Sequence, residues 1–234
     1  DKNIYIKSLS KIHFFFTEIC YNKFALRENK EIDHGWLHSH NCYGKRKKEG
    51  IPMKGFIFDL DGTLLDSMPS WQRQIDDMLL AKGITPPEDL LDRTKTLGLE
   101  NATGMILQEF HLPDDPAAVY QQFQNNMEQL YCTTIPLKPG VRALLEHLQK
   151  AGASMVVATA TARPLVEKVL QHHQLQDYFQ SITTVAEVGI GKHDPRIYLV
   201  AAGKLGLLPQ DCIVFEDSLK GIRSANQAGF QTVA

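Results

Sequence analysis

The sequence predicts an α/β protein in which a parallel sheet carries an inserted, all-helical segment. Two observations predict this fold class. Short apolar runs that are typical of buried strands alternate with amphipathic helical patterns through the second half of the chain, which indicates a parallel sheet with helices on both faces. Several helical patterns without a strand separate the first apolar run from the others. We therefore expect a Rossmann-like core and a helical cap over the carboxyl edge of its sheet, where open α/β sheets bind ligands.

The first strand is predicted at Phe56-Ile57-Phe58, within the stretch GFIFDLDGTLLDS. This run is apolar on both faces and too short for a helix. Asp59 follows it directly and Asp61 comes two positions later, so both carboxylates are expected on one side of the strand end. Two neighbouring carboxylates repel each other unless a positive charge lies beside them. The pair therefore indicates a metal ion, a proton, or both.

Residues 67–138 are predicted as the cap, named the cap segment below. Glycines and prolines divide it into amphipathic stretches. The expected helices run from Pro69 to Lys82, Pro87 to Leu97, Asn101 to His111 and Pro116 to Cys132. Asp66 and Ser67 are interpreted as the N-cap of the first helix. Trp71 and Tyr131 are expected in the core of the helical bundle rather than against a substrate.

Helices and strands alternate after Pro136. The predicted strands are Ser154 to Ala158, Ile182 to Val185 and Cys212 to Phe215. The predicted helices run from Pro139-Gly140 to Leu148, Pro164 to His173, Pro195 to Leu205 and Leu219 to Ala228. Residues 53–66 and 139–234 are therefore expected to form the core.

Residues 1–52 differ from the rest in composition. They hold 10 Lys and Arg against 6 Asp and Glu, a net charge of +4, so the remaining 182 residues carry −6. Histidines and a cysteine between residues 34 and 42 lie beside a basic run, but their spacing matches no zinc finger of a nucleic-acid-binding module. Met53 fits a natural start. We therefore expect residues 1–52 to be a poorly ordered or non-native extension.

The overall composition excludes other classes. A chain of 234 residues with 43% apolar residues and a net charge of −2 is typical of a globular protein. No run approaches the roughly 18 apolar residues of a membrane span, and no secretory signal is visible. The four cysteines form no C-x-x-C pair, which favours a reduced, cytoplasmic setting. We expect neither a nucleic acid nor a membrane as a partner, and nothing in the sequence specifies an oligomeric state.

Polar residues gather where the predicted strands end. They are Asp59 and Asp61, Thr159, Lys192 in the loop after the third strand, and Glu216 and Asp217; Ala160, which follows Thr159, offers its backbone N–H. Because parallel strands end at one edge of a sheet, we expect these residues to lie together. A carboxylate can attack phosphorus, and a second carboxyl can move protons. Mg²⁺ suits an all-oxygen site, and a lysine and a hydroxyl bind phosphoryl oxygens. The set indicates phosphoryl transfer from a small ester.

These motifs resemble the haloacid dehalogenase (HAD) superfamily, in the phosphoglycolate phosphatase and β-phosphoglucomutase-like branch whose helical cap follows the first motif. The stretch DLDGTL, residues 59–64, is similar to the first motif. Thr159 is similar to the second, Lys192 to the third and Glu216-Asp217 to the fourth. The resemblance covers about residues 53–234, and the first and fourth motifs in this order are highly specific.

The resemblance implies a Mg²⁺-dependent phosphatase that hydrolyses a small phosphorylated metabolite, such as a sugar phosphate, through an aspartyl-phosphate. The implied catalytic residues are Asp59 as nucleophile, Asp61 as general acid and base, Thr159 and Lys192. The implied substrate-binding residues are Thr159, Ala160 and Lys192. The implied metal ligands are Asp59, Glu216, Asp217 and, through its backbone carbonyl, Asp61.

Other chemistries stay open as alternatives. Sugar phosphomutases of the β-phosphoglucomutase type share all four motifs, but they usually carry a histidine where this chain has Ser70-Trp71 and an arginine where it reads Gly98-Leu99-Glu100-Asn101. Dehalogenases typically lack the second aspartate, which is Asp61 here. A non-catalytic phosphate-binding protein is disfavoured because every motif residue is present. We therefore favour hydrolysis.

The chain departs from the family pattern in two places. The family commonly shows Lys-Pro-x-Pro-Asp at the third motif, where this chain reads Lys192-His193-Asp194-Pro195-Arg196. The lysine is kept, so we expect the chemistry to be unchanged and the loop geometry to differ. Family members also continue into a further strand and helix, so we expect the natural protein to extend beyond Ala234.

Overall fold

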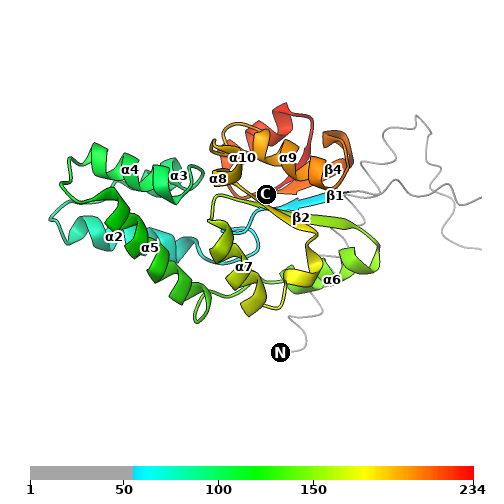
Figure 1. The fold of residues 1–234 in the computed structure, drawn as a ribbon, viewed down its shortest axis with the longest axis horizontal. Coiled ribbons are helices and arrows are strands. Elements are labelled where there is room, and N and C mark those ends of the chain that lie inside the picture. The colour runs from blue at the N-terminus through cyan, green and yellow to red at the C-terminus, as the bar shows by residue number, and fades with distance from the viewer. Residues whose placement is uncertain (1–54) are drawn as a thin grey trace, which may run out of the picture. The chain divides into compact units, whose positions relative to one another are not determined.

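The structure, a computed structural model, describes residues 55–234. The extension predicted for residues 1–52 lies outside the described residues. One parallel sheet forms the centre of the described part (Figure 1). Its strands are β1 (Gly55–Phe58), β2 (Ser154–Thr159), β3 (Ser181–Thr184), β4 (Cys212–Phe215) and β5 (Gln231–Val233). They pair in the order β3-β2-β1-β4-β5. The predicted α/β class is confirmed.

The order of the strands determines where a site can form. The chain passes from β1 outward to β3 and then crosses back to β4, so the direction of winding reverses between β1 and β4. At such a reversal the connections leave the two strands toward opposite faces and open a crevice at the carboxyl edge. The acidic pairs predicted at the ends of β1 and β4 therefore lie at this crevice.

Helices cover both faces of the sheet. The helices of this part are α6 (Val141–Lys150), α7 (Arg163–His172), α8 (Val185–Val188), α9 (Arg196–Lys204) and α10 (Leu219–Gln227), with short 3-10 turns at Gln176–Tyr178 and Pro209–Asp211. Figure 1 shows α6 and α7 on one face and α9 and α10 on the other. Among the described residues, no helix is both long and apolar enough to cross a membrane.

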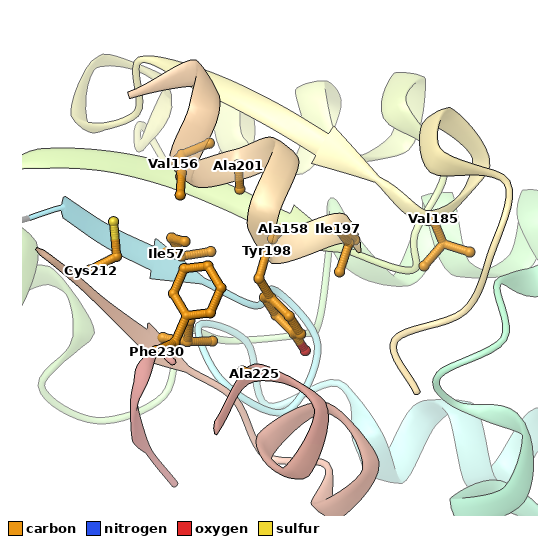
Figure 2. Close-up of a cluster of buried hydrophobic side chains, with 12 residues drawn as sticks. Ile57, Val156, Ala158, Val185, Ile197, Tyr198, Ala201, Cys212, Ala225 and Phe230 are labelled. Carbon is orange, nitrogen blue, oxygen red and sulfur yellow. The ribbon is translucent and has the colours of Figure 1, made fainter. Parts of the chain in front are cut away.

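The strand β1 is buried on both faces, as its uninterrupted apolar run predicts. On one face Ile57 belongs to a cluster in which β1 and β2 pack against Tyr198 and Ala201 of α9 (Figure 2). On the other face the Phe58 ring stacks on Phe215 of β4, with ring centroids 4.6 Å apart. Close packing of side chains against both faces of β1 holds the end of the strand in one position. Asp59 is therefore attached to a rigid support.

The cap segment contains α2 (Met68–Leu80), α3 (Leu90–Thr94), α4 (Leu99–Glu109) and α5 (Pro116–Tyr131). Ile75 and Leu79, one turn apart on α2, are buried with Leu90 and Ile106 in an apolar cluster of their own. Two connections link the sheet to the cap segment, and they run antiparallel to each other. Two backbone hydrogen bonds join them: the Asp66 N–H donates to the Pro136 carbonyl at 3.0 Å, and the Lys138 N–H donates to the Leu64 carbonyl at 2.9 Å. The predicted division into core and cap stays a prediction.

Several element boundaries differ from the predictions. The second cap helix is confined to Leu90–Thr94, and the third strand ends at Thr184 because that side chain accepts a hydrogen bond from Glu187 N–H and caps the short helix α8. Neither α8 nor the edge strand β5 was predicted. Both are short, and β5 is half-buried throughout, so neither shows a clear periodicity.

Candidate active site

The acids after β1 and β4 form the centre of the site. Asp59 N–H donates to the Phe215 carbonyl at 2.9 Å and so extends the pairing of β1 with β4 by one residue. This bond places Asp59 beside Glu216 and Asp217. Carboxylate oxygens of these three residues all lie within 4.8 Å of one another. Such a set of hard oxygen donors could hold a divalent cation.

Lys192 bridges two of these acids. Its side chain is only 2% exposed, and its Nζ lies 2.5 Å from Asp59 Oδ1 and 2.8 Å from Glu216 Oε2. Glu216 also accepts hydrogen bonds from the Tyr198 hydroxyl at 2.9 Å and the Ser218 hydroxyl at 2.5 Å. The Tyr198 ring belongs to the cluster of Figure 2, so the apolar core fixes this donor. Each buried charge thus has fixed partners, as burial of a charge requires.

The pKa values of the three groups follow from their burial and mutual charge. Burial, together with the negative charge of Glu216, raises the pKa of Asp59 well above its usual range, although Lys192 opposes this. Burial alone would lower the pKa of Lys192, but the charges of Asp59 and Glu216 outweigh it and raise this pKa well above normal. Burial likewise raises the pKa of Glu216, but Lys192 outweighs it and the net shift is downward. Lys192 therefore stays a cation, and further positive charge beside Asp59 would favour its carboxylate form.

Asp217 approaches the chain very closely at Gly62. Gly62 has a φ of +84°, and a Cβ on it would lie 2.7 Å from the carboxyl carbon of Asp217. Only glycine satisfies both conditions. The Lys95 ammonium of the cap segment lies 3.1 Å from Asp217 Oδ2, which links the cap segment to the core at this acid.

Asp61 accepts hydrogen bonds from four side chains. The hydroxyls of Ser67 and Thr161 each donate to it at 2.6 Å, Trp71 Nε1 donates at 3.3 Å, and the Tyr131 hydroxyl forms a short bond. Burial, and then the charge of Asp61, raise the pKa of Tyr131 well above its usual range, so this phenol keeps its proton. The carboxylate of Asp61 is therefore held by neutral donors rather than by a cation.

Two interpretations of cap residues need correction. Ser67 does occupy the N-cap position of α2, but its hydroxyl makes no capping bond and donates to Asp61 instead. Trp71 and Tyr131 were expected in the helical core, and Tyr131 is indeed fully buried, but both donate to Asp61. No local pattern distinguishes these residues from ordinary core aromatics.

All predicted site residues line one cleft. They are Asp59, Asp61, Thr159, Ala160, Lys192, Glu216 and Asp217. Thr159 is buried at the end of β2, and its hydroxyl accepts a bond from Thr161 N–H at 3.1 Å. The roles assigned to these residues stay predictions. Thr161, Ser67 and Lys95 belong to the same site and were not predicted; Thr161, two positions after Thr159, carried the one available signal, a second hydroxyl at a strand end.

The cap segment forms the opposite wall of the cleft. Its lining is largely apolar and includes Trp71, Ile75, Leu91, Ile106 and Phe123. The cap segment and the strand ends thus enclose a cleft with the charged residues on one side and mostly apolar side chains on the other.

A parallel sheet with buried acids at its winding reversal, a bridging lysine and a helical cap defines a class of phosphoryl-transfer enzymes. The chain belongs to the haloacid dehalogenase-like hydrolase family, whose model matches residues 53–229. The predicted resemblance is thus confirmed.

Relatives of the chain include named phosphatases. It is 34% identical over 183 residues to a probable pseudouridine-5'-phosphatase of Drosophila melanogaster, covering 76% of this chain and 79% of that protein. It is 33% identical over 186 residues to hexitol phosphatase A of Escherichia coli strain K12, covering 77% and 82%. The prediction of a HAD-like phosphoric monoester hydrolase is confirmed by the family and these relatives.

Solved structures share the fold. CbbY from Rhodobacter sphaeroides, in complex with phosphate, matches with a TM-score of 0.67 at 26% identity and covers 77% of this chain and 84% of that one. A β-phosphoglucomutase from Clostridium difficile matches with a TM-score of 0.68 at 22% identity, covering 78% and 84%. At this identity the second match shows a likeness of fold alone.

Proposed function

We propose that this chain is a Mg²⁺-dependent phosphatase that hydrolyses a small sugar phosphate or a related monoester through an aspartyl-phosphate on Asp59. The observation that carries the proposal is the bridge of Lys192 between Asp59 and Glu216, beside Asp217. It combines a buried carboxylate nucleophile, a fixed cation and oxygen donors for a metal within one cleft, which is what phosphoryl transfer from a small ester requires. The cytoplasmic location stays a prediction from the scattered cysteines.

The donor set fits Mg²⁺. The three carboxylates supply hard oxygen ligands, and the missing side chain of Gly62 leaves the room in which Asp217 lies. Asp59, Glu216, Asp217 and the Asp61 carbonyl would hold the ion. When bound, the metal would reduce the repulsion between the nucleophile and the phosphoryl group.

The residues divide the reaction into two displacements. The Asp59 carboxylate attacks phosphorus while Asp61 protonates the departing oxygen, and an alcohol leaves. Asp61 then accepts a proton from water, the water oxygen attacks the phosphorus of the aspartyl-phosphate, and inorganic phosphate departs from a regenerated Asp59. Lys192 and the Thr159 hydroxyl balance and orient the phosphoryl oxygens, aided by the backbone N–H of Ala160. The apolar cap wall excludes bulk water.

The relatives narrow the substrate class. Two are named for phosphate esters of a nucleoside and of hexitols, and a CbbY structure at 26% identity holds xylulose-(1,5)bisphosphate. These compounds share a polyhydroxylated leaving group. Hydrolysis is preferred over mutase activity because the relatives reported above as 33–34% identical are named phosphatases.

The test is phosphate release from pseudouridine 5'-phosphate, hexitol phosphates and hexose phosphates, with Mg²⁺ and with a chelator. We expect metal-dependent release from at least one class, and Asp59→Asn should lower its rate by at least about a thousandfold because the nucleophile is lost. A thermal melt of the variant checks that it folds. Unchanged release by D59N would refute the nucleophile. Isomer interconversion without release would point to a mutase, and neither activity in a folded, Mg²⁺-binding protein would point to a binding protein.

A further inference from the structure

The two oxygens of Asp61 have different surroundings. Oδ1 accepts bonds from Ser67, Trp71 and Tyr131, whereas Oδ2 accepts one, from the Thr161 hydroxyl at 2.6 Å. A carboxylate oxygen offers about two lone-pair sites. Oδ1 is therefore saturated, while Oδ2 keeps room for a further partner. Oδ2 is therefore the oxygen of Asp61 that is available to exchange a proton with a substrate.

Tyr131 is oriented toward Asp61 by its own neighbour. Trp71 shares its single N–H between Asp61 Oδ1, at 3.3 Å, and the Tyr131 oxygen, at 3.2 Å. Because Tyr131 accepts from Trp71, its phenolic hydrogen is free to point at Asp61 Oδ1. Hydrogen bonds to a charged acceptor are among the stronger ones in proteins. The three groups form a short chain of bonds from α2 and α5 to the carboxylate.

Packing alone does not explain this hydroxyl. Tyr131 completes a buried stripe on α5 with Val119, Phe123 and Met127, spaced four residues apart. The other three are apolar, and a phenylalanine would fill the same space as the Tyr131 ring. Tyr131 is the last residue of α5, and the connection that leads from this helix back to the sheet pairs with the one that leads from the sheet into the cap segment.

We propose that Tyr131 is a positioning residue: with Trp71 it holds Oδ1 of Asp61 and so aims Oδ2 at the leaving-group oxygen. This inference rests on the proposed function. Because Tyr131 and Trp71 belong to cap helices and Asp61 to the core, the alignment requires the cap segment in the position seen here. Proton transfer to the leaving group is thereby linked to the placement of the cap.

The experiment compares two leaving groups in the full chain carrying Tyr131→Phe. A sugar phosphate needs a proton on its leaving oxygen, whereas p-nitrophenyl phosphate releases a stable phenolate without one. The ratio kcat/KM reports the steps up to transfer of the phosphoryl group to Asp59. We expect kcat/KM for the sugar phosphate to fall at least about tenfold, since a positioned general acid contributes up to 10²–10⁴-fold, and that for the aryl phosphate to change by less than about threefold.

Two further variants keep the proposal falsifiable. Tyr120→Phe, a half-buried tyrosine on the same helix, should leave both ratios unchanged. Trp71→Phe keeps an aromatic ring but removes the N–H, and should show the same leaving-group dependence as Y131F, more weakly. Equal losses on both substrates, or no loss in either variant, would overturn the role of Tyr131. Absence of wild-type turnover on both substrates would instead refute the proposed function, and the role of Tyr131 with it.

Discussion

The two walls of the cleft differ in kind. The core wall concentrates charge: Asp59, Glu216 and Lys192 are all nearly inaccessible and contact one another. The cap wall is mostly hydrocarbon, and the contacts of the cap segment with Asp61 come from the neutral donors Ser67, Trp71 and Tyr131. The packed sheet holds the partners of each buried charge at fixed distances. A displaced partner would leave a buried charge uncompensated and so lower the stability of the protein.

This difference suits the two walls to different functions. Strand ends fixed by stacked side chains are suited to groups that must meet phosphorus with little error. Helices packed on an apolar cluster of their own are suited to covering a substrate and aligning a proton donor. Neutral groups in the cap wall also add little to the electrostatic field that the core wall creates. The predictions below test this contrast.

The largest effect is expected for Lys192→Met in the core wall. The substitution leaves the carboxylates of Asp59 and Glu216 buried without their cation. Breaking a buried pair in this way costs about 3–5 kcal/mol. We expect urea unfolding in chelator to show a loss of this size, and phosphate release to fall by at least about a thousandfold.

The matched control is Lys168→Met. Lys168 pairs with Glu128, but both side chains are exposed, at 53% and 40%. Exposed pairs contribute at most about 1 kcal/mol, so K168M should change stability by less than that and leave phosphate release unchanged. Similar stability losses in the two variants would contradict the buried charge network of the core wall.

An intermediate effect is expected for Gly62→Ala. The added Cβ would lie 2.7 Å from the Asp217 carboxyl and displace it from Asp59 and Glu216. Alanine also strains a backbone with φ of +84°, by about 1–2 kcal/mol. Calorimetric titration should show Mg²⁺ binding weakened at least about tenfold, because a displaced ligand contributes little to the site.

Gly152→Ala separates strain from displacement. Gly152 has a similar φ of +73°, but nothing lies within 4 Å of its Cβ position. It should lose a similar amount of stability and bind Mg²⁺ normally. Equal Mg²⁺ affinities in G62A and G152A would mean that Asp217 tolerates displacement and that its assignment as a ligand is wrong.

The core wall was predictable from the sequence because its residues follow buried apolar runs directly. Asp59 follows the β1 run and Glu216 the β4 run, so a local pattern indicates both the strand and the position of the acid. Parallel pairing then brings the strand ends together without further information. The family motifs at Thr159 and Lys192 completed the set.

The cap wall was not predictable in the same way. Tyr131 lies 70 positions from Asp61, and Lys95 lies 122 positions from Asp217. These contacts depend on how helices pack across the cleft, which periodicity within one helix does not encode. For the same reason Ser67 was assigned to an N-cap, a local role, whereas its hydroxyl bonds to a residue of the core.

The smallest effect, and the most informative about the cap, is expected for Lys95→Met. The Lys95 ammonium lies 3.1 Å from Asp217 Oδ2 and brings a positive charge from the cap segment to the core wall. Its removal takes away a cation that opposes Mg²⁺ at Asp217, so Mg²⁺ should bind about threefold more tightly. It also removes a partly buried ion pair between the walls, so KM should rise about threefold. Both changes should shrink in high salt.

Asp92→Asn is the matched control, because Asp92 pairs with the same ammonium at 3.1 Å but is 76% exposed. It should change neither constant by more than about 1.5-fold. A higher KM together with a higher Mg²⁺ affinity in K95M alone would mean that the cap segment adjusts the charge of the core wall at Asp217. If KM and the Mg²⁺ affinity are unchanged in K95M, the cap segment contributes only apolar cover and the neutral donors at Asp61. In that case no charged residue of the cap segment would influence the acids of the core wall.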